Sequence, residues 1–164
     1  MVLDDDALSE WVRQHGYVEL RWAREDDDVN RITVAAMSQT RFGGRGQGWI
    51  NEEPVRTFAK RLGDYPLNES DPPTLVVGSH RLGEPLHTQV SLRVYPIGSR
   101  GQLGIQVHLA TEPWQAPPMR AEEYESVALE VRTTYQRLED FGRDLRDVLD
   151  GHDTIARIDG EHLA

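Results

Sequence analysis

The chain has 164 residues, a formal net charge of −10 and no cysteine. This length suits one domain with one hydrophobic core, so we expect a single domain over residues 1–164. Without cysteine, a disulfide scaffold, a cysteine-ligated zinc module and a cysteine nucleophile are excluded. The apolar runs are far shorter than the roughly 18 residues of a membrane-spanning helix. Because the acidic start of the chain is also unlike a secretory signal peptide, we predict a cytoplasmic protein without a membrane partner.

The first part of the chain is an acidic extension over residues 1–16, followed by a predicted hairpin. Apolar residues at helical spacing before Gly16 predict a short helix over about 4–14. Apolar and polar residues then alternate within 17–22 and again within 32–36, which is the periodicity of strands. The acidic run between them predicts the turn of an antiparallel hairpin.

A glycine-rich stretch at residues 43–48 precedes the first strong helix pattern. Its spacing matches neither a P-loop nor a dinucleotide-binding motif. Glu52 and Glu53, in the first helical turn, would repel a phosphate group. A bulged strand, or one closely covered by another element, accounts better for these glycines. The helix is predicted over about 51–62, because Asn51 is a good N-cap and apolar residues follow at helical spacing.

The second half of the chain is rich in strand patterns and ends in a long amphipathic helix. A proline-rich connector over 111–120, which contains Trp114, cannot be a central strand. The predicted elements are strands over 75–79, 90–94, 105–109 and 127–131, a helix over 134–150 and a short final strand over 155–158. We therefore predict an α+β fold in which two main amphipathic helices pack on an antiparallel sheet of about six to eight strands.

Motifs for catalysis or metal binding are missing from the sequence. The histidines lack the spacing of a metal site, so we expect no metal and no cofactor. There is no G-x-S-x-G and no S-x-x-K pattern, so no serine stands out as a nucleophile and we predict no enzyme. One alternative hypothesis is a small-molecule-binding or enzymatic domain, with a pocket formed around Trp49, Arg93 and His108. In that case His108, with Glu112 near it in sequence, could serve as an acid or base.

Charge is the most informative feature of the sequence, because both ends of the chain are acidic and residues 31–120 are mildly basic. An acidic protein gains nothing from counterion release on a phosphate backbone, which disfavours direct nucleic-acid binding. We therefore expect a basic protein partner. The candidate contact residues lie at the predicted hairpin tip and on the outer face of the last helix: Glu25, Asp26, Asp27, Asp28, Glu139, Asp140, Asp144 and Asp147.

A third hypothesis is a structural subunit of a larger assembly, suggested by Trp114 in the connector. The oligomeric state is left open by the sequence. A small-molecule site, a subunit interface and an acidic binding surface thus remain as alternatives at this level.

Several stretches, in order over about residues 17–150, match one family pattern. They are Phe42-x-Gly-x-Gly through Trp49, Asn51-Glu52-Glu53, Phe58-Ala59-x-x-Leu62 to Tyr65-Pro66-Leu67, Ser91 to Pro96, Gly101 to Ile105, and Leu129-Glu130-Val131 to Leu145. In these the chain resembles small bacterial proteins of the WapI-like immunity type. The resemblance implies an α+β domain that binds a toxin and occludes it. An acidic surface would suit a basic toxin of the nuclease type.

Overall fold

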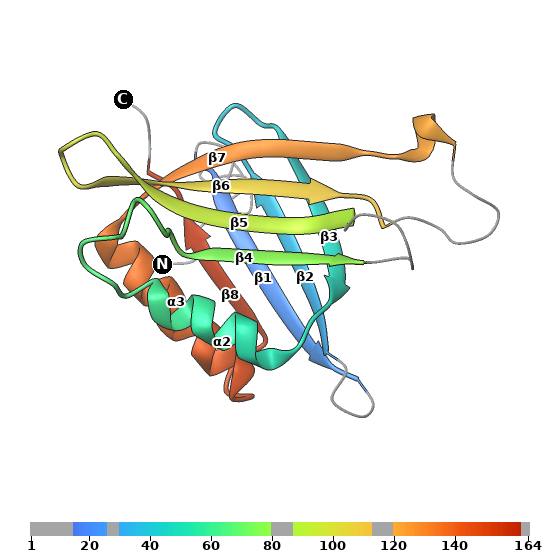
Figure 1. The fold of residues 1–164 in the computed structure, drawn as a ribbon, viewed down its shortest axis with the longest axis horizontal. Helices are drawn as coiled ribbons and strands as arrows, with labels where there is room; N and C mark the ends of the chain where they lie inside the picture. Colours follow the sequence, from blue (N-terminus) through green and yellow to red (C-terminus); the bar gives the residue numbers. More distant parts are fainter. Residues whose placement is uncertain (1–14, 26–29, 80–86, 113–119, 162–164) are drawn as a thin grey trace, which may run out of the picture.

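Eight strands and two α-helices make up the computed structural model, which describes residues 15–25, 30–79, 87–112 and 120–161 (Figure 1). The strands are β1 (Tyr17–Arg24), β2 (Asn30–Met37), β3 (Gly43–Trp49), β4 (Thr74–Ser79), β5 (His87–Ile97), β6 (Gln102–Ala110), β7 (Ser126–Thr134) and β8 (Ile155–Asp159). The helices are α2 (Glu52–Arg61), α3 (Tyr135–Leu149) and the 3-10 turn η1 (Ala121–Glu123). The predicted α+β class is confirmed. The helix predicted over 4–14 and Trp114 lie outside the described residues.

The prediction of one sheet is wrong, because the strands form two antiparallel sheets of four strands each. The first sheet has the order β3-β2-β1-β8, and the second has the order β4-β5-β6-β7. Alternating apolar residues identify a strand but do not identify its neighbours. The final strand, β8, returns to pair with β1, with Leu20 opposite Ala156. Helix α2 follows β3, and the chain then enters the second sheet at β4.

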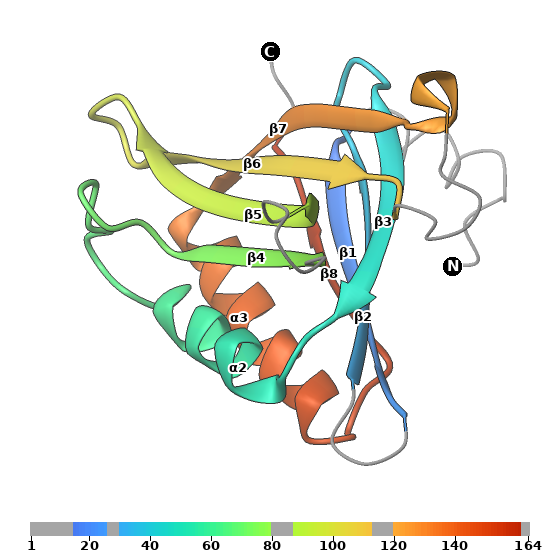
Figure 2. The same cartoon turned by 45° about the vertical axis from the view of Figure 1, so that its right-hand side comes forward.

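The glycines of β3 allow the two sheets to approach closely. Strand β3 runs across the strands of the second sheet and contacts all four of them (Figure 2). A Cβ added at Gly46 would lie 2.7 Å from the backbone oxygen of Gln89, and one at Gly48 would lie 2.6 Å from Cγ1 of Val77. Side chains are thus sterically excluded at these positions. The expectation of a closely covered strand is confirmed.

The two helices pack against each other and close the open side between the sheets (Figure 2). A Cβ at Gly142 of α3 would lie 2.6 Å from the backbone oxygen of Ala59, so the glycine lets α2 approach. Helix α3 begins after Thr134, whose side chain accepts a hydrogen bond from the Arg137 amide. Both sheets and both helices contribute to one hydrophobic core, in which Phe141 is among the largest buried side chains. In the described part of the chain, no helix combines the length and the apolar character needed to cross a membrane.

Candidate functional site

Three of the predicted contact residues form a stripe along one flank of α3, where each of them is half-buried. The helix buries Leu138, Phe141 and Leu145 in the core, which turns the intervening positions outward. Asp140, Asp144 and Asp147 are spaced four and three residues apart, so they lie on one side of the helix. We call these three residues the α3 acidic stripe. Glu139 is exposed as well, but it is turned about 100° away from Asp140 around the helix axis.

The stripe is short of counter-charge. Arg143 donates a hydrogen bond of 3.0 Å to Asp140, and Gln136 donates one of 3.2 Å to the same carboxylate. No described residue forms an ion pair with Asp144 or Asp147. The carboxylates of the stripe therefore repel each other, and Arg143 compensates part of this repulsion at both Asp140 and Asp144.

The titration of Asp144 reflects partial burial first and the neighbouring charges second. Partial burial of its carboxyl raises the pKa above the ordinary value, and the nearby charges of Asp147, Asp140 and Asp153 raise it further. Arg143 acts in the opposite direction. Asp153 was missed by the sequence reasoning because it follows the end of the helix, where periodicity gives no information about its neighbours. The cluster at the C-terminal half of α3 thus comprises one more acid than predicted.

The predicted hairpin tip lies only partly within the described residues. Glu25 is exposed and forms an ion pair of 3.2 Å with Arg31 of β2. Asp26, Asp27 and Asp28 lie outside the described residues. The β1–β2 hairpin itself is confirmed, with Arg24 opposite Asn30 at its last pair.

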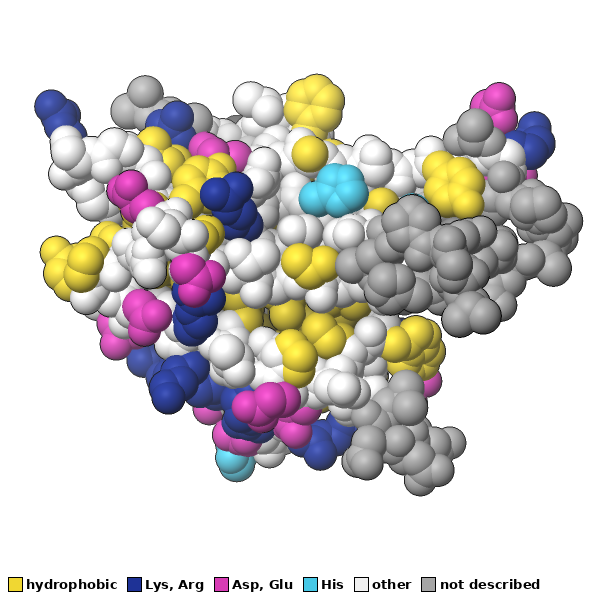
Figure 3. Space-filling model, in the orientation of Figure 1, with side chains coloured by type: hydrophobic (Ala, Val, Ile, Leu, Met, Phe, Trp, Pro, Cys, Tyr) yellow, Lys and Arg dark blue, Asp and Glu magenta, His cyan; other side chains and the backbone are white. Residues whose placement is uncertain are grey.

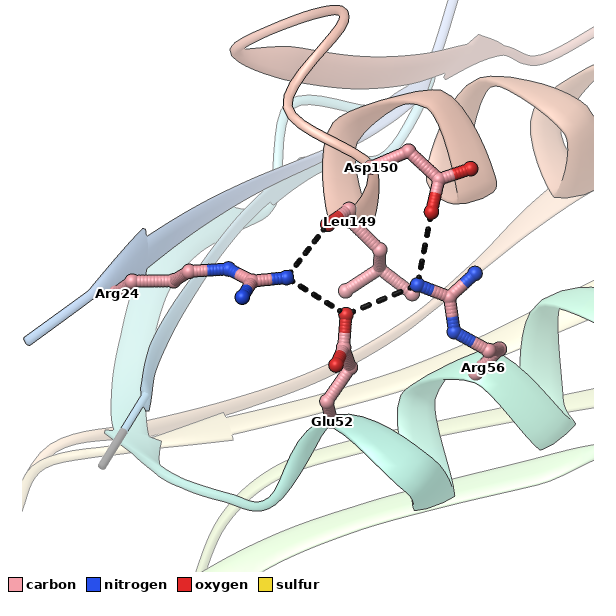
Figure 4. A network of polar contacts seen from close by, with 5 residues as sticks. All are labelled: Arg24, Glu52, Arg56, Leu149 and Asp150. Atoms are coloured by element: carbon pink, nitrogen blue, oxygen red, sulfur yellow. Dashed lines mark hydrogen bonds and ion pairs between the residues drawn. The ribbon is translucent and has the colours of Figure 1, made fainter. Parts of the chain in front are cut away.

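A network of polar contacts joins the hairpin to both helices (Figure 4). One amino group of Arg24 donates 3.0 Å hydrogen bonds to the Glu52 carboxylate and to the backbone oxygen of Leu149. Arg56 donates 2.9 Å bonds to Glu52 and to Asp150. These two carboxylates raise the pKa of Arg56. The network places the end of β1, next to Glu25, against the C-terminal end of α3.

Of the predicted hairpin acids, Glu25 is the one within the described residues, and it follows the end of β1 that the network holds against the C-terminal end of α3. Asp150 is bound by Arg56, so it is not free to attract a partner. Asp147 lies within one turn of Leu149, the residue that Arg24 contacts. Asp140 lies about 13 Å from Leu149 along the axis of α3, at a rise of 1.5 Å per residue. The junction of the hairpin with α3 therefore holds Arg24 and Arg56 beside Glu52 and Asp150, and the carboxylates without an ion pair lie further along α3.

The pocket considered around Trp49, Arg93 and His108 does not form. Trp49 lies on the outer face of the first sheet, where it is 46% exposed and the Arg31 guanidinium is 5.9 Å from the centre of its ring system. Arg93 and His108 alternate with buried residues of β5 and β6, so they point outward from the second sheet. These three side chains are on different sheets and cannot line one cavity.

A small polar cleft lies where the start of β1 and the β2–β3 turn meet the edge of β7. Its volume is about 170 Å³, which is below the roughly 300–1,000 Å³ of typical ligand pockets. Its lining residues are Gly16, Ser38, Gln39, Thr40, Glu130, Val131, Arg132, Gly160 and Glu161. Within the described ranges, no three His, Asp or Glu side chains are grouped so that they could hold a metal ion.

Comparisons with known proteins identify no relative of this chain. No protein-family model, no curated protein and no solved structure matches the chain. The functional argument therefore rests on the geometry and charge of the chain itself and on the motifs of its sequence.

Proposed function

We propose that this chain is a non-enzymatic immunity protein of the cytoplasm, which binds a basic toxin of the nuclease type and occludes its active site. The observation that carries the proposal is the α3 acidic stripe, whose carboxylates at Asp144 and Asp147 lack an ion pair among the described residues. The resemblance to WapI-like immunity proteins supports the same function. Glu25, at the end of β1, would extend the contact surface.

A basic partner would supply the charge that the stripe lacks. Lysine or arginine side chains placed near Asp144 would favour its ionised form and lower its raised pKa. Complementary charge also steers two proteins together and raises the association rate, more than it raises affinity at an exposed rim. A nuclease cleft is basic because it holds a phosphate backbone, so a row of carboxylates could compete for the same groups.

The first test is capture of partners from the source cell lysate on the immobilised chain, at low and at high salt, followed by mass spectrometry. We expect one stoichiometric basic protein, which is released by salt because exposed charge pairs are screened. The purified partner should cleave nucleic acid alone and lose this activity when the chain is added. Absence of any protein partner at both salt concentrations would contradict the proposal.

A variant and a matched control test whether the captured partner binds to α3. The stripe-neutralised variant carries Asp140→Asn, Asp144→Asn and Asp147→Asn. The control carries Glu53→Gln, Asp64→Asn and Glu69→Gln, which are exposed acids at the start of α2 and in the loop before β4. Both variants change the net charge by the same amount. We expect only the stripe-neutralised variant to lose the partner, and equal retention by both would refute the assignment to α3.

A further inference from the structure

The outer face of the second sheet carries little charge for so acidic a protein. Outward side chains of β4 to β7 include Thr74, Val76, Ser91, Gln106 and Ala128, all without charge. Figure 3 views this face: white, yellow and cyan side chains cover its middle, and dark blue and magenta ones gather toward its left and lower margins. Charged residues are depleted at the centres of protein interfaces, so the face has the composition of a docking surface.

The few charges on this face are two arginines and one glutamate, of which Arg132 and Glu130 form an ion pair. The three residues are Arg93, Glu130 and Arg132. The Tyr95 hydroxyl donates a hydrogen bond to the Glu130 carboxylate, and Arg132 lies 3.9 Å from the same carboxylate. The Arg93 guanidinium lies 5.8 Å from the ring centre of Tyr95. Burying this face would therefore leave Arg93 without a carboxylate, and its guanidinium would need hydrogen-bond acceptors from the partner to offset the cost of burial.

The strand register makes the face complementary to itself. One row across the sheet contains Val76, Ser91, His108 and Ala128, in the order β4 to β7. A twofold axis parallel to the strands, between β5 and β6, would place β4 of one copy over β7 of the other. Val76 would then face Ala128 of the second copy, and Ser91 would face its His108. The Ser91–His108 pair lies beside this axis, and the Val76–Ala128 pair lies about 7 Å from it at a strand spacing of about 4.8 Å. A twist of about 30° between stacked sheets would displace the outer pair by about 4 Å.

The neighbouring row also avoids repulsion in this arrangement. It contains Thr74, Arg93, Gln106 and Glu130. Arg93 would face Gln106 of the second copy, and Glu130 would face its Thr74. No like charges are opposed in either row, although each chain has a net charge of −10.

We propose that a second copy of this chain is the occupant of this face, in a symmetric dimer with the two second sheets packed together. Four strands at about 4.8 Å spacing and at most nine residues at about 3.3 Å give a planar footprint of roughly 19 Å by 30 Å, or about 570 Å², and the six-residue β4 makes it smaller. This is below the roughly 800 Å² per partner of a standard interface, so we expect a weak dimer. The face is separate from the α3 acidic stripe. The dimer and the proposed function can therefore be tested independently.

Sedimentation equilibrium of the purified chain tests the dimer. We expect concentration-dependent dimers that persist at high salt, because the contact is neutral. Val76→Lys and Ala128→Glu should each weaken association at least about tenfold, as expected for a charge buried against an apolar group. The double variant should regain most of the association, because the new lysine of each copy faces the new glutamate of the other.

Control variants distinguish the loss of this specific pairing from effects of net charge or of unfolding. Val76→Lys brings the net charge closer to zero, so weaker association cannot come from overall repulsion. Gln47→Lys makes the same change on the outer face of the first sheet and should leave association unchanged. Val76 is 44% exposed and Ala128 is exposed, so thermal unfolding should show all variants folded. A wild-type chain that stays monomeric up to about 0.5 mM (a free energy near −4 to −5 kcal/mol), or a double variant no better than the singles, would overturn the proposal.

Discussion

Replacement of Gly46 by alanine tests the close contact between the two sheets. The new Cβ would lie 2.7 Å from the backbone oxygen of Gln89, 3.2 Å from Cγ2 of Val90 and 3.4 Å from Cδ2 of Leu109. The first of these contacts is with backbone, which cannot rotate away, so β3 or β5 must shift. Overpacking of this kind costs about 1–3 kcal/mol. Alanine restricts the unfolded chain more than glycine does, which offsets the cost by less than about 1 kcal/mol.

Urea denaturation and calorimetry measure the effect. We expect Gly46→Ala to lower the free energy of unfolding by about 1–2 kcal/mol, which corresponds to a decrease in Tm of roughly 2–8 °C for a chain of this size. The matched control is Gly63→Ala, because the only atom near a Cβ there is the Lys60 oxygen at 3.6 Å. The control should be neutral or slightly stabilising. If both variants were equally stable, the steric account of the β3 glycines would be wrong.

Three further predictions use the same structure. Gly142→Ala should destabilise the protein by about 1–3 kcal/mol in urea denaturation, because its Cβ would lie 2.6 Å from the Ala59 oxygen. Alanine favours helices more than glycine does, so a gain in stability would refute the close contact between the helices. Burial and the bond to Glu130 raise the pKa of Tyr95 to about 12, so its stabilising contribution is complete below pH 10 and is lost as the pH rises through about 12. The ultraviolet difference titration between wild type and Tyr95→Phe should show this midpoint, and Glu130→Gln should lower it; a midpoint at 10 would contradict the contact. The pKa of Asp144 is also raised, so the native state is favoured while this carboxyl is protonated and loses stability as the pH rises through that pKa. Asp144→Asn should therefore stabilise the protein by about 0.5 kcal/mol at pH 7 and have no effect near pH 3, and a destabilised variant at pH 7 would contradict the raised pKa of this half-buried carboxyl.

Most strands and both helices could be predicted from the sequence, because their periodicity depends on local burial. Alternation in 105–109 indicates a strand whose buried residues face a core, and this is how β6 lies. The pairing of β1 with β8 joins residues more than 130 positions apart, and no local pattern encodes it. The same limitation explains why one sheet was expected where two are present.

The candidate site was predictable to the extent that it lies on one helix. The spacing of Asp140, Asp144 and Asp147 follows from helical geometry alone. The contact of Arg24 with Leu149, and the closeness of Asp153 to Asp144, depend on how distant segments pack. Trp49 and His108 lie on strands of different sheets. The local pattern of each strand does not show to which sheet it belongs, so the sequence alone is compatible with one shared pocket.

The salt dependence of binding is the most direct test of the central claim that α3 binds a basic partner. The dissociation constant of the captured toxin would be measured by calorimetry between about 50 and 500 mM salt, a range over which the Debye length falls from roughly 14 to 4 Å. We predict a steep loss of affinity for the wild-type chain and for the Glu53, Asp64 and Glu69 control, and a shallow dependence for the stripe-neutralised variant. Identical salt dependence for all three proteins would contradict the claim.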